Sequence, residues 1–160
     1  MKNRTVTPYW IALKPLFRRY GVCLRSEPTE IQIQQVIKKW LSTHEVNQEP
    51  LSCHKGFGID IVDFEVRVNG FFVGIEAKGY SNQGCNITRA LDQLKRYSKL
   101  YDYVFLIVHC SGLKTEFEKI LPFTSTMIKK KLKILKIAEI DTLLQKYPFS
   151  KGTLTTGEPQ

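Results

Sequence analysis

The clearest pattern of apolar and polar positions lies in the middle of the chain, where two apolar, β-prone runs flank Asn69-Gly70. An Asn-Gly pair between such runs is the strongest short signal for a β-hairpin, because the tight turn needs residues that tolerate positive φ angles. We therefore predict a hairpin made of residues 59–68 and 71–78, in which Val66 lies opposite Val73.

The predicted register of this hairpin brings three charged side chains together. It places Asp63 opposite Glu76, and because side chains alternate between the faces of a strand, Lys78 should share their face. Burying such charges is costly unless they are paired or hold a metal. Two carboxylates suit Mg²⁺, which usually takes one or two of them and completes its octahedron with waters and phosphate oxygens. The simpler alternative is an exposed hairpin with a surface Lys–Glu pair.

Helical and strand patterns surround the hairpin. Thr29 begins a helix, and Gln32 completes a Thr-x-x-Gln capping box. A second helix is predicted over residues 88–101. Residues 103–109 are almost continuously apolar, which is typical of a strand buried on both faces of a sheet. We therefore predict an α/β fold with a mixed central sheet that contains the hairpin and has helices on both faces.

Weaker patterns flank this core. They predict a helix over 8–20, a short first strand within 45–53, a helix over 115–121, a lysine-bearing edge strand over 129–137 and a short helix over 140–147. Residues 149–160 are rich in Ser, Thr, Gly and Pro, so we expect a disordered tail. The expected organisation is a single domain over 1–148, divided into a basic extension (1–26), a core (27–110) and C-terminal elements (111–148).

The charge of the chain favours a polyanionic partner. The formal net charge is +9 over 160 residues. Residues 1–26 hold six Lys/Arg and no acid, whereas residues 27–80 hold eight of the fifteen acids against five bases. Acids therefore gather around the hairpin and bases gather in the flanks, which fits a protein that grips phosphates while its acids hold a metal.

Two observations bear on the location of the protein. No apolar run approaches the ~20 residues of a membrane span, and the N-terminus lacks a secretory signal. The four cysteines are widely spaced and form no C-x-x-C pair. We therefore expect reduced thiols, a cytoplasmic protein and no membrane partner. Cys53-His54 alone is only a weak signal for zinc.

The order of charged residues resembles a known nuclease pattern. An acid on one strand, followed after a hairpin by Glu-x-Lys on the next, resembles the PD-(D/E)xK nuclease superfamily. The matching residues are Asp63 and Glu76-Ala77-Lys78, and the resemblance extends over residues 27–110 in the order helix, strands, helix, strand. It implies a restriction-endonuclease-like αβββαβ core and hydrolysis of DNA phosphodiester bonds with Mg²⁺, for which Mn²⁺ can substitute.

The resemblance also implies roles for the hairpin residues. Asp63 and Glu76 would be metal ligands, with the Ala77 carbonyl as a third, and Lys78 would orient or activate the attacking water. The family's first acid often follows a proline, whereas this chain has Val62-Asp63 or Ile59-Asp60. Asp60 is therefore the alternative first ligand, although it needs a β-bulge to reach the same face.

Two helices supply further candidates. Glu30 lies on the apolar stripe of the first helix, as does a glutamate that often faces the active site in the family, and it would hold a second metal or a water. Glu27 is the alternative, and the macrodipole favours acids in any first helical turn. On the second helix, Gln93 and Tyr97 resemble a Gln-x-x-x-Tyr motif whose glutamine positions phosphate or the lysine. The nearby cations Arg89, Arg96 and Lys99 are either phosphate contacts or a solvated face.

The resemblance favours a structure-directed or weakly selective DNA nuclease, such as a junction resolvase or repair enzyme, because the core leaves little chain for a sequence-reading domain. Endonuclease and exonuclease action, and a monomer or a homodimer, stay open. A non-catalytic nucleic-acid-binding protein on a nuclease-like fold is the main alternative, and a metal-free protein-interaction module is a third. Fold and function can separate, so these steps depend on the site itself.

Overall fold

The computed structural model describes residues 6–44, 47–49, 62–68, 70–124 and 126–143. Several expectations fall outside these ranges: the first hairpin residues 59–61, the alternative ligand Asp60, the Cys53-His54 pair, the end of the last helix (144–147) and the tail 149–160. Residues 45–46, the remainder of 50–61 and residue 69 of the predicted core also lie outside these ranges.

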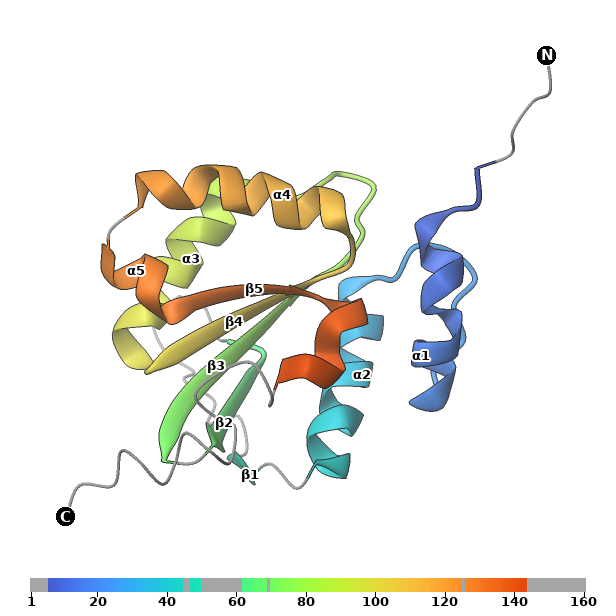
Figure 1. Cartoon of the computed structure of the whole chain (residues 1–160), viewed down its shortest axis with the longest axis horizontal. Coiled ribbons are helices and arrows are strands. Elements are labelled where there is room, and N and C mark those ends of the chain that lie inside the picture. The colour runs from blue at the N-terminus through green and yellow to red at the C-terminus, as the bar shows by residue number, and fades with distance from the viewer. Residues whose placement is uncertain (1–5, 45–46, 50–61, 69, 125, 144–160) are drawn as a thin grey trace.

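Within the described ranges, the strands form a five-stranded mixed sheet in sequence order (Figure 1). They are β1 (Asn47–Glu49), β2 (Phe64–Val68), β3 (Phe71–Lys78), β4 (Tyr103–Val108) and β5 (Leu132–Lys136). Pairing is antiparallel from β1 to β3 and parallel from β3 to β5. The predicted α/β fold with a mixed sheet is confirmed.

The hairpin has the predicted register. Val66 pairs with Val73 and Phe64 pairs with Ile75 across β2 and β3. Gly70 has a φ of 86°, a left-handed conformation that a glycine adopts without steric cost. Strand β2 begins at Phe64, so the described residues Val62 and Asp63 of the predicted strand 59–68 precede it.

Helices cover both faces of the sheet, and Figure 1 shows α3, α4 and α5 on the side opposite α2. One layer contains η1 (Tyr9–Leu13), α1 (Lys14–Arg19), α2 (Glu30–Thr43) and η3 (Ile137–Thr142), and the other contains α3 (Ile87–Leu100), α4 (Ser111–Ile120), η2 (Leu121–Phe123) and α5 (Thr126–Lys131). Strand β4 divides its side chains between the layers, because Phe105 and Ile107 belong to one core and Leu106 to the other.

Helix α2 begins as its capping box predicts. The Thr29 amide donates to Oε1 of Gln32 at 3.0 Å, and the Gln32 amide donates to Oγ1 of Thr29 at 3.3 Å. Near the other end of α2, the indole of the fully buried Trp40 donates to Oδ1 of Asp141 at 3.2 Å. The other oxygen of Asp141 accepts from Arg19 at 3.2 Å. Asp141 therefore links α1, α2 and η3.

Several predicted boundaries are wrong. The helix predicted over 8–20 divides into η1 and α1, and Pro15 lies in the first turn of α1, where its missing N–H costs nothing. Helix α4 begins at Ser111 rather than 115. Of the helix predicted over 140–147, the first residues belong to the 3₁₀ segment η3, which begins at Ile137, and residues 144–147 lie outside the described ranges.

Residues 129–131 were predicted as strand, but they form the end of α5. The ammonium of Lys131 donates to the carbonyls of Ser98 at 2.8 Å and Tyr101 at 3.2 Å, at the C-terminal end of α3. Cations at such a helix end satisfy open carbonyls, which favours the helical turn at this lysine. No helix within the described ranges is long and apolar enough to cross a membrane.

Candidate active site

The structure brings the two carboxylates of the predicted metal site together. The amide of Asp63 donates to Oε1 of Glu76 at 3.2 Å, and the amide of Ala77 donates to Oδ2 of Asp63 at 2.7 Å. The backbone bends at Asp63, just before β2 begins. The Asp63 carboxylate therefore accepts the hydrogen bond from Ala77 that a backbone carbonyl of the neighbouring strand would otherwise accept. The hairpin itself therefore holds both acids in position.

Burial raises the pKa of Glu76, the more deeply buried acid of this pair. Glu76 is 5% exposed, and its burial together with the negative charge of Asp63 raises the pKa of Glu76 to about 9. Burial and the nearby Glu76 carboxylate raise the pKa of Tyr97. Glu76 therefore keeps its proton at neutral pH unless a cation replaces it, since two close carboxylates cannot both ionise cheaply in a buried site.

The donor set fits a Mg²⁺ ion that keeps several waters. Asp63 and Glu76 supply two carboxylates, the number Mg²⁺ usually takes from a protein. The Ala77 carbonyl points to the same side of β3 as its N–H, toward Asp63, because the two groups of one strand residue point the same way. Among the described residues, no three His, Cys, Asp or Glu side chains group as metal ligands.

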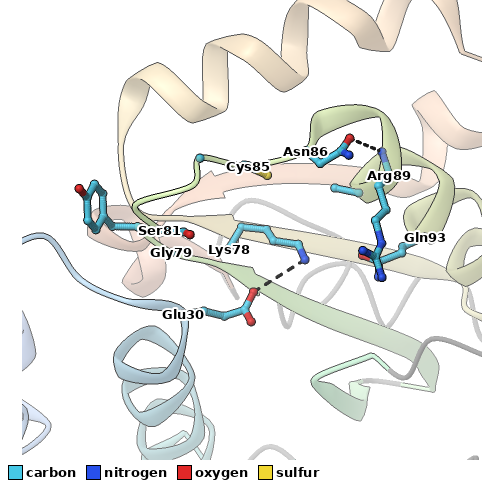
Figure 2. Close-up of a pocket in the computed structure, with 11 residues that line it drawn as sticks. Glu30, Lys78, Gly79, Ser81, Cys85, Asn86, Arg89 and Gln93 are labelled. Carbon is cyan, nitrogen blue, oxygen red and sulfur yellow. Dashed lines mark hydrogen bonds and ion pairs between the residues drawn. The ribbon is translucent and has the colours of Figure 1, made fainter.

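Lys78 and Glu30 form the next part of the site. Lys78 follows Glu76 on the same face of β3, and its ammonium lies 3.7 Å from Oε1 of Glu30 (Figure 2). This pair forms because the start of α2 lies against Gly79, where the Tyr80 amide donates to the Pro28 carbonyl at 2.8 Å. Burial raises the pKa of Glu30, and the charge of Lys78 opposes that shift.

The alternative glutamate lies elsewhere. Glu27 lies beside the hydroxyl of Tyr9, which is hydrogen-bonded to Nδ1 of His109. The ring of His109 in turn packs against Tyr80, with 6.3 Å between the ring centroids. These contacts hold η1 at the end of β4. The sequence analysis did not select His109, and a strand-end histidine alone gave no signal of this cluster.

Helix α3 contributes the Gln-x-x-x-Tyr pair. Tyr97 is 2% exposed and reaches Glu76 from the helix layer above β3. Gln93, one turn earlier, lines a cavity of about 350 Å³ together with Lys78 and Glu30. The structure thus places the residues predicted from both helices around the end of β3.

The cavity is also lined by Arg89, whose role the sequence does not decide, and by residues that the sequence does not single out. Arg89 of α3 lines it, as do Tyr80, Ser81 and Cys85 of the loop after β3. The sequence signal for Arg89 is its spacing, since it precedes Gln93 by four residues and therefore lies on the same helix face.

A second buried acid lies on the same face of the sheet. Glu65 is 5% exposed and accepts a hydrogen bond from the Tyr101 hydroxyl at 2.5 Å. Gly74, opposite Glu65, makes room for this contact, because a Cβ there would lie 2.9 Å from the Tyr101 ring. Strand alternation puts Glu65 on the face of Asp63, which is the sequence signal that was missed.

Comparison of the chain with protein-family models, with curated proteins and with solved structures found no match in any of the three. The assignment of a function therefore depends on the chemistry of the described residues. That chemistry consists of two adjacent carboxylates, an amine two residues further along β3, and a cavity with further polar side chains.

Proposed function

We propose that the chain is a Mg²⁺-dependent nuclease that hydrolyses phosphodiester bonds in DNA, built on a restriction-endonuclease-like core. The observation that carries this proposal is the carboxylate pair of Asp63 and Glu76, joined across the hairpin and followed by Lys78 on the same face. A buried acid such as Glu76 next to the half-buried Asp63 is costly without a counter-ion, which favours a metal site over an exposed surface pair.

The order of elements supports the proposal. Helix α2, strands β1 to β3, helix α3 and strand β4 follow one another along the chain, which is the αβββαβ order that the nuclease resemblance implies. The hairpin of β2 and β3 carries the acids, and α2 and α3 supply Glu30 and Gln93 from either side.

Each side chain then has a chemical task. Bound Mg²⁺ would polarise the phosphate, lower the pKa of a water and steady the leaving oxygen. Asp63 and Glu76 would hold the ion, and Glu76 would lose its proton as the ion binds. Lys78, held near Glu30, would orient the attacking water and offset developing negative charge. Gln93 would position the phosphate or Lys78.

The charge of the chain supports a nucleic-acid substrate. The net charge is +9, and α1 carries the exposed cation Arg18 beside Arg19, which is paired with Asp141. Cations of this kind bind phosphates through release of counter-ions. DNA is proposed over RNA, and weak sequence selectivity over strict selectivity, from the family resemblance alone. The active protein would be a monomer or a homodimer.

One observation favours a second candidate function. Glu76 as a protonated acid already accepts from the Asp63 amide at 3.2 Å and lies beside Tyr97, so the pair can persist in a protein without metal. A non-catalytic nucleic-acid-binding protein on the same fold is therefore the alternative.

A cleavage assay separates the two functions. Linear, single-stranded and branched DNA would each be incubated with the protein in Mg²⁺, Mn²⁺ or EDTA. We expect cutting that depends on the metal and is lost in Asp63→Asn. Tight binding without cutting on any of these substrates would favour the alternative. Loss of cutting in Asp60→Asn with retention in Asp63→Asn would move the first ligand to Asp60.

A further inference from the structure

We infer that the cavity beside Lys78 binds a phosphate group of the cleaved nucleic-acid strand, one that neighbours the reacting phosphate, with Arg89 as its main cationic contact. This inference rests on the proposed nuclease function and adds a substrate-binding subsite to it. The cavity lies at the junction of β3, the following loop and α3.

Arg89 is held in place through its backbone while its side chain stays available. Its amide donates to Oδ1 of the N-cap residue Asn86 at 3.1 Å. Figure 2 shows the guanidinium extending from α3 toward the level of Gln93 and Lys78. Within the described ranges, the structure gives this guanidinium no ion-pair partner. A guanidinium with free N–H groups matches the oxygens of a phosphate in a bidentate manner.

Neighbouring cations differ from Arg89 in this respect. On α3, Lys95 lies 3.9 Å from the carboxylate of Asp92. The ammonium of Lys131 contacts the carbonyls of Ser98 and Tyr101 at the end of the same helix. Lys95 and Lys131 are therefore engaged in contacts within the protein, whereas Arg89 lines the cavity.

Other donors converge on the same space. Gln93 lies one turn after Arg89, and Lys78 enters from β3. The hydroxyl of Ser81 accepts from the Gln83 amide at 3.3 Å, which leaves its own proton to donate. The charged side chains that line the cavity are the cations Arg89 and Lys78 and one acid, Glu30. Glu30 lies 3.7 Å from Lys78, and both side chains of this ion pair are partly exposed. The cavity therefore favours an anion.

The size and position of the cavity point to a strand rather than a free ion. Its volume of about 350 Å³ exceeds what a bare phosphate needs and accommodates part of the attached sugar. Neither Asp63 nor Glu76 lines it. Glu76 and Lys78 are two residues apart on β3, a rise of roughly 7 Å. A strand whose reacting phosphate lies at the acid pair thus reaches the cavity with a neighbouring nucleotide.

The experiment compares Arg89→Gln with Lys99→Gln, a matched change on the same helix at an exposed lysine in its last turn. Binding of a short single-stranded oligonucleotide would be measured in EDTA, and cleavage would be measured separately in Mg²⁺. We expect Arg89→Gln to weaken binding about tenfold or more, since hydrogen bonds to charged groups are strong, and Lys99→Gln to change it less than about twofold. Because the contact is to a non-reacting group, KM should rise while kcat stays constant.

Two probe series identify the source of the phosphate. One compares an oligonucleotide with a 5′-phosphate to the same strand with a 5′-hydroxyl, and the other replaces single internal phosphates by neutral methylphosphonates. If removal of the 5′-phosphate weakens binding by the wild type and not by Arg89→Gln, the cavity binds the phosphate at a strand end. If a single methylphosphonate has this effect instead, the cavity binds an internal phosphodiester. Arg89→Lys, which keeps the charge without the bidentate geometry, should bind between the wild type and Arg89→Gln.

The outcomes separate this inference from the proposed function. Equal binding by Arg89→Gln and Lys99→Gln, with both variants as thermally stable as the wild type, overturns the subsite even if the protein cleaves DNA. Binding that depends on Arg89, in a protein that cleaves nothing, supports the subsite while the nuclease proposal fails.

Discussion

Gly79 and Glu30 approach each other so closely that a Cβ on Gly79 would lie 2.2 Å from the amide nitrogen of Glu30. Rotation of a side chain cannot relieve this contact, because both atoms would belong to the rigid part of the chain. The approach brings the first turn of α2 to the end of β3. It therefore places the carboxylate of Glu30 3.7 Å from the ammonium of Lys78.

We predict that Gly79→Ala destabilises the fold by about 1–3 kcal/mol, since α2 must move away from β3 to admit the methyl group. Gly112→Ala is the matched control, because a Cβ at Gly112 in α4 would meet only Sγ of Cys110 at 3.8 Å. Alanine is the better helix former, so this control should be neutral or stabilising by up to about 1 kcal/mol. Urea denaturation of both variants checks the prediction, which equal stabilities would contradict.

The pKa of Glu76 predicts how stability depends on pH. The folded state raises this pKa from its ordinary value to about 9, so the folded protein keeps a proton that the unfolded chain releases. The stabilising contribution of that proton is complete below the ordinary pKa and is lost as pH rises toward 9. We expect the free energy of unfolding to fall by on the order of a few kcal/mol between pH 5 and pH 9.

Glu76→Gln should flatten this dependence, because the amide does not titrate. Mg²⁺ should stabilise the wild type more at pH 9 than at pH 6, since the ion competes with the proton for Glu76. Urea titrations at these pH values, with Mg²⁺ or EDTA, measure both effects. A wild-type profile that runs parallel to that of Glu76→Gln would show that the proton on Glu76 does not contribute.

Because Asp141 accepts hydrogen bonds from Trp40 and Arg19, substitutions at Asp141 should lower the stability of the fold. Asp141→Ala leaves the indole N–H of the buried Trp40 without its acceptor, which should cost about 1–3 kcal/mol. Asp141→Asn keeps an oxygen that can accept from Trp40, so its cost should be clearly smaller. Thermal melting followed by tryptophan fluorescence compares the two. Equal losses in both variants would assign the effect to the charge of Asp141 rather than to the indole.

The proposed role of Lys78 predicts a selective loss of activity. Lys78→Ala should lower the single-turnover rate of Mg²⁺-dependent cleavage by about 10²–10³-fold, the range seen when one charge-stabilising group is removed. Lys95→Ala changes an exposed lysine of α3 that pairs with Asp92, and it should cleave at the wild-type rate. A normal rate in Lys78→Ala would remove the amine from the mechanism.

The sequence predicts the hairpin well because the signals are local. Asn69-Gly70 sets the turn, and once the register is set, strand alternation places Asp63 and Glu76 together. The capping box predicts the start of α2 for the same reason, since Thr29 and Gln32 interact within a single turn.

The remaining features depend on contacts between distant parts of the chain. The close approach of Gly79 to α2 and the hydrogen bond from Tyr101 to Glu65 arise only after the layers pack. Helix formation at residues 129–131 likewise involves Lys131 and the end of α3, which local propensity does not reveal. The direction of Arg89 into the cavity follows from how α3 lies on the sheet.

The central claim is that the pair of Asp63 and Glu76 holds a catalytic metal. Glu65 is a built-in control, because it is as buried as Glu76, lies on the same face of the sheet and accepts a hydrogen bond from Tyr101, the C-cap residue of α3. The most direct measurement is the rate of Mg²⁺-dependent DNA cleavage by Glu76→Gln and Glu65→Gln, with folding checked by circular dichroism. We predict a loss of at least about 10²-fold in Glu76→Gln and near-normal cleavage in Glu65→Gln. Equal rates in the two folded variants would contradict the claim.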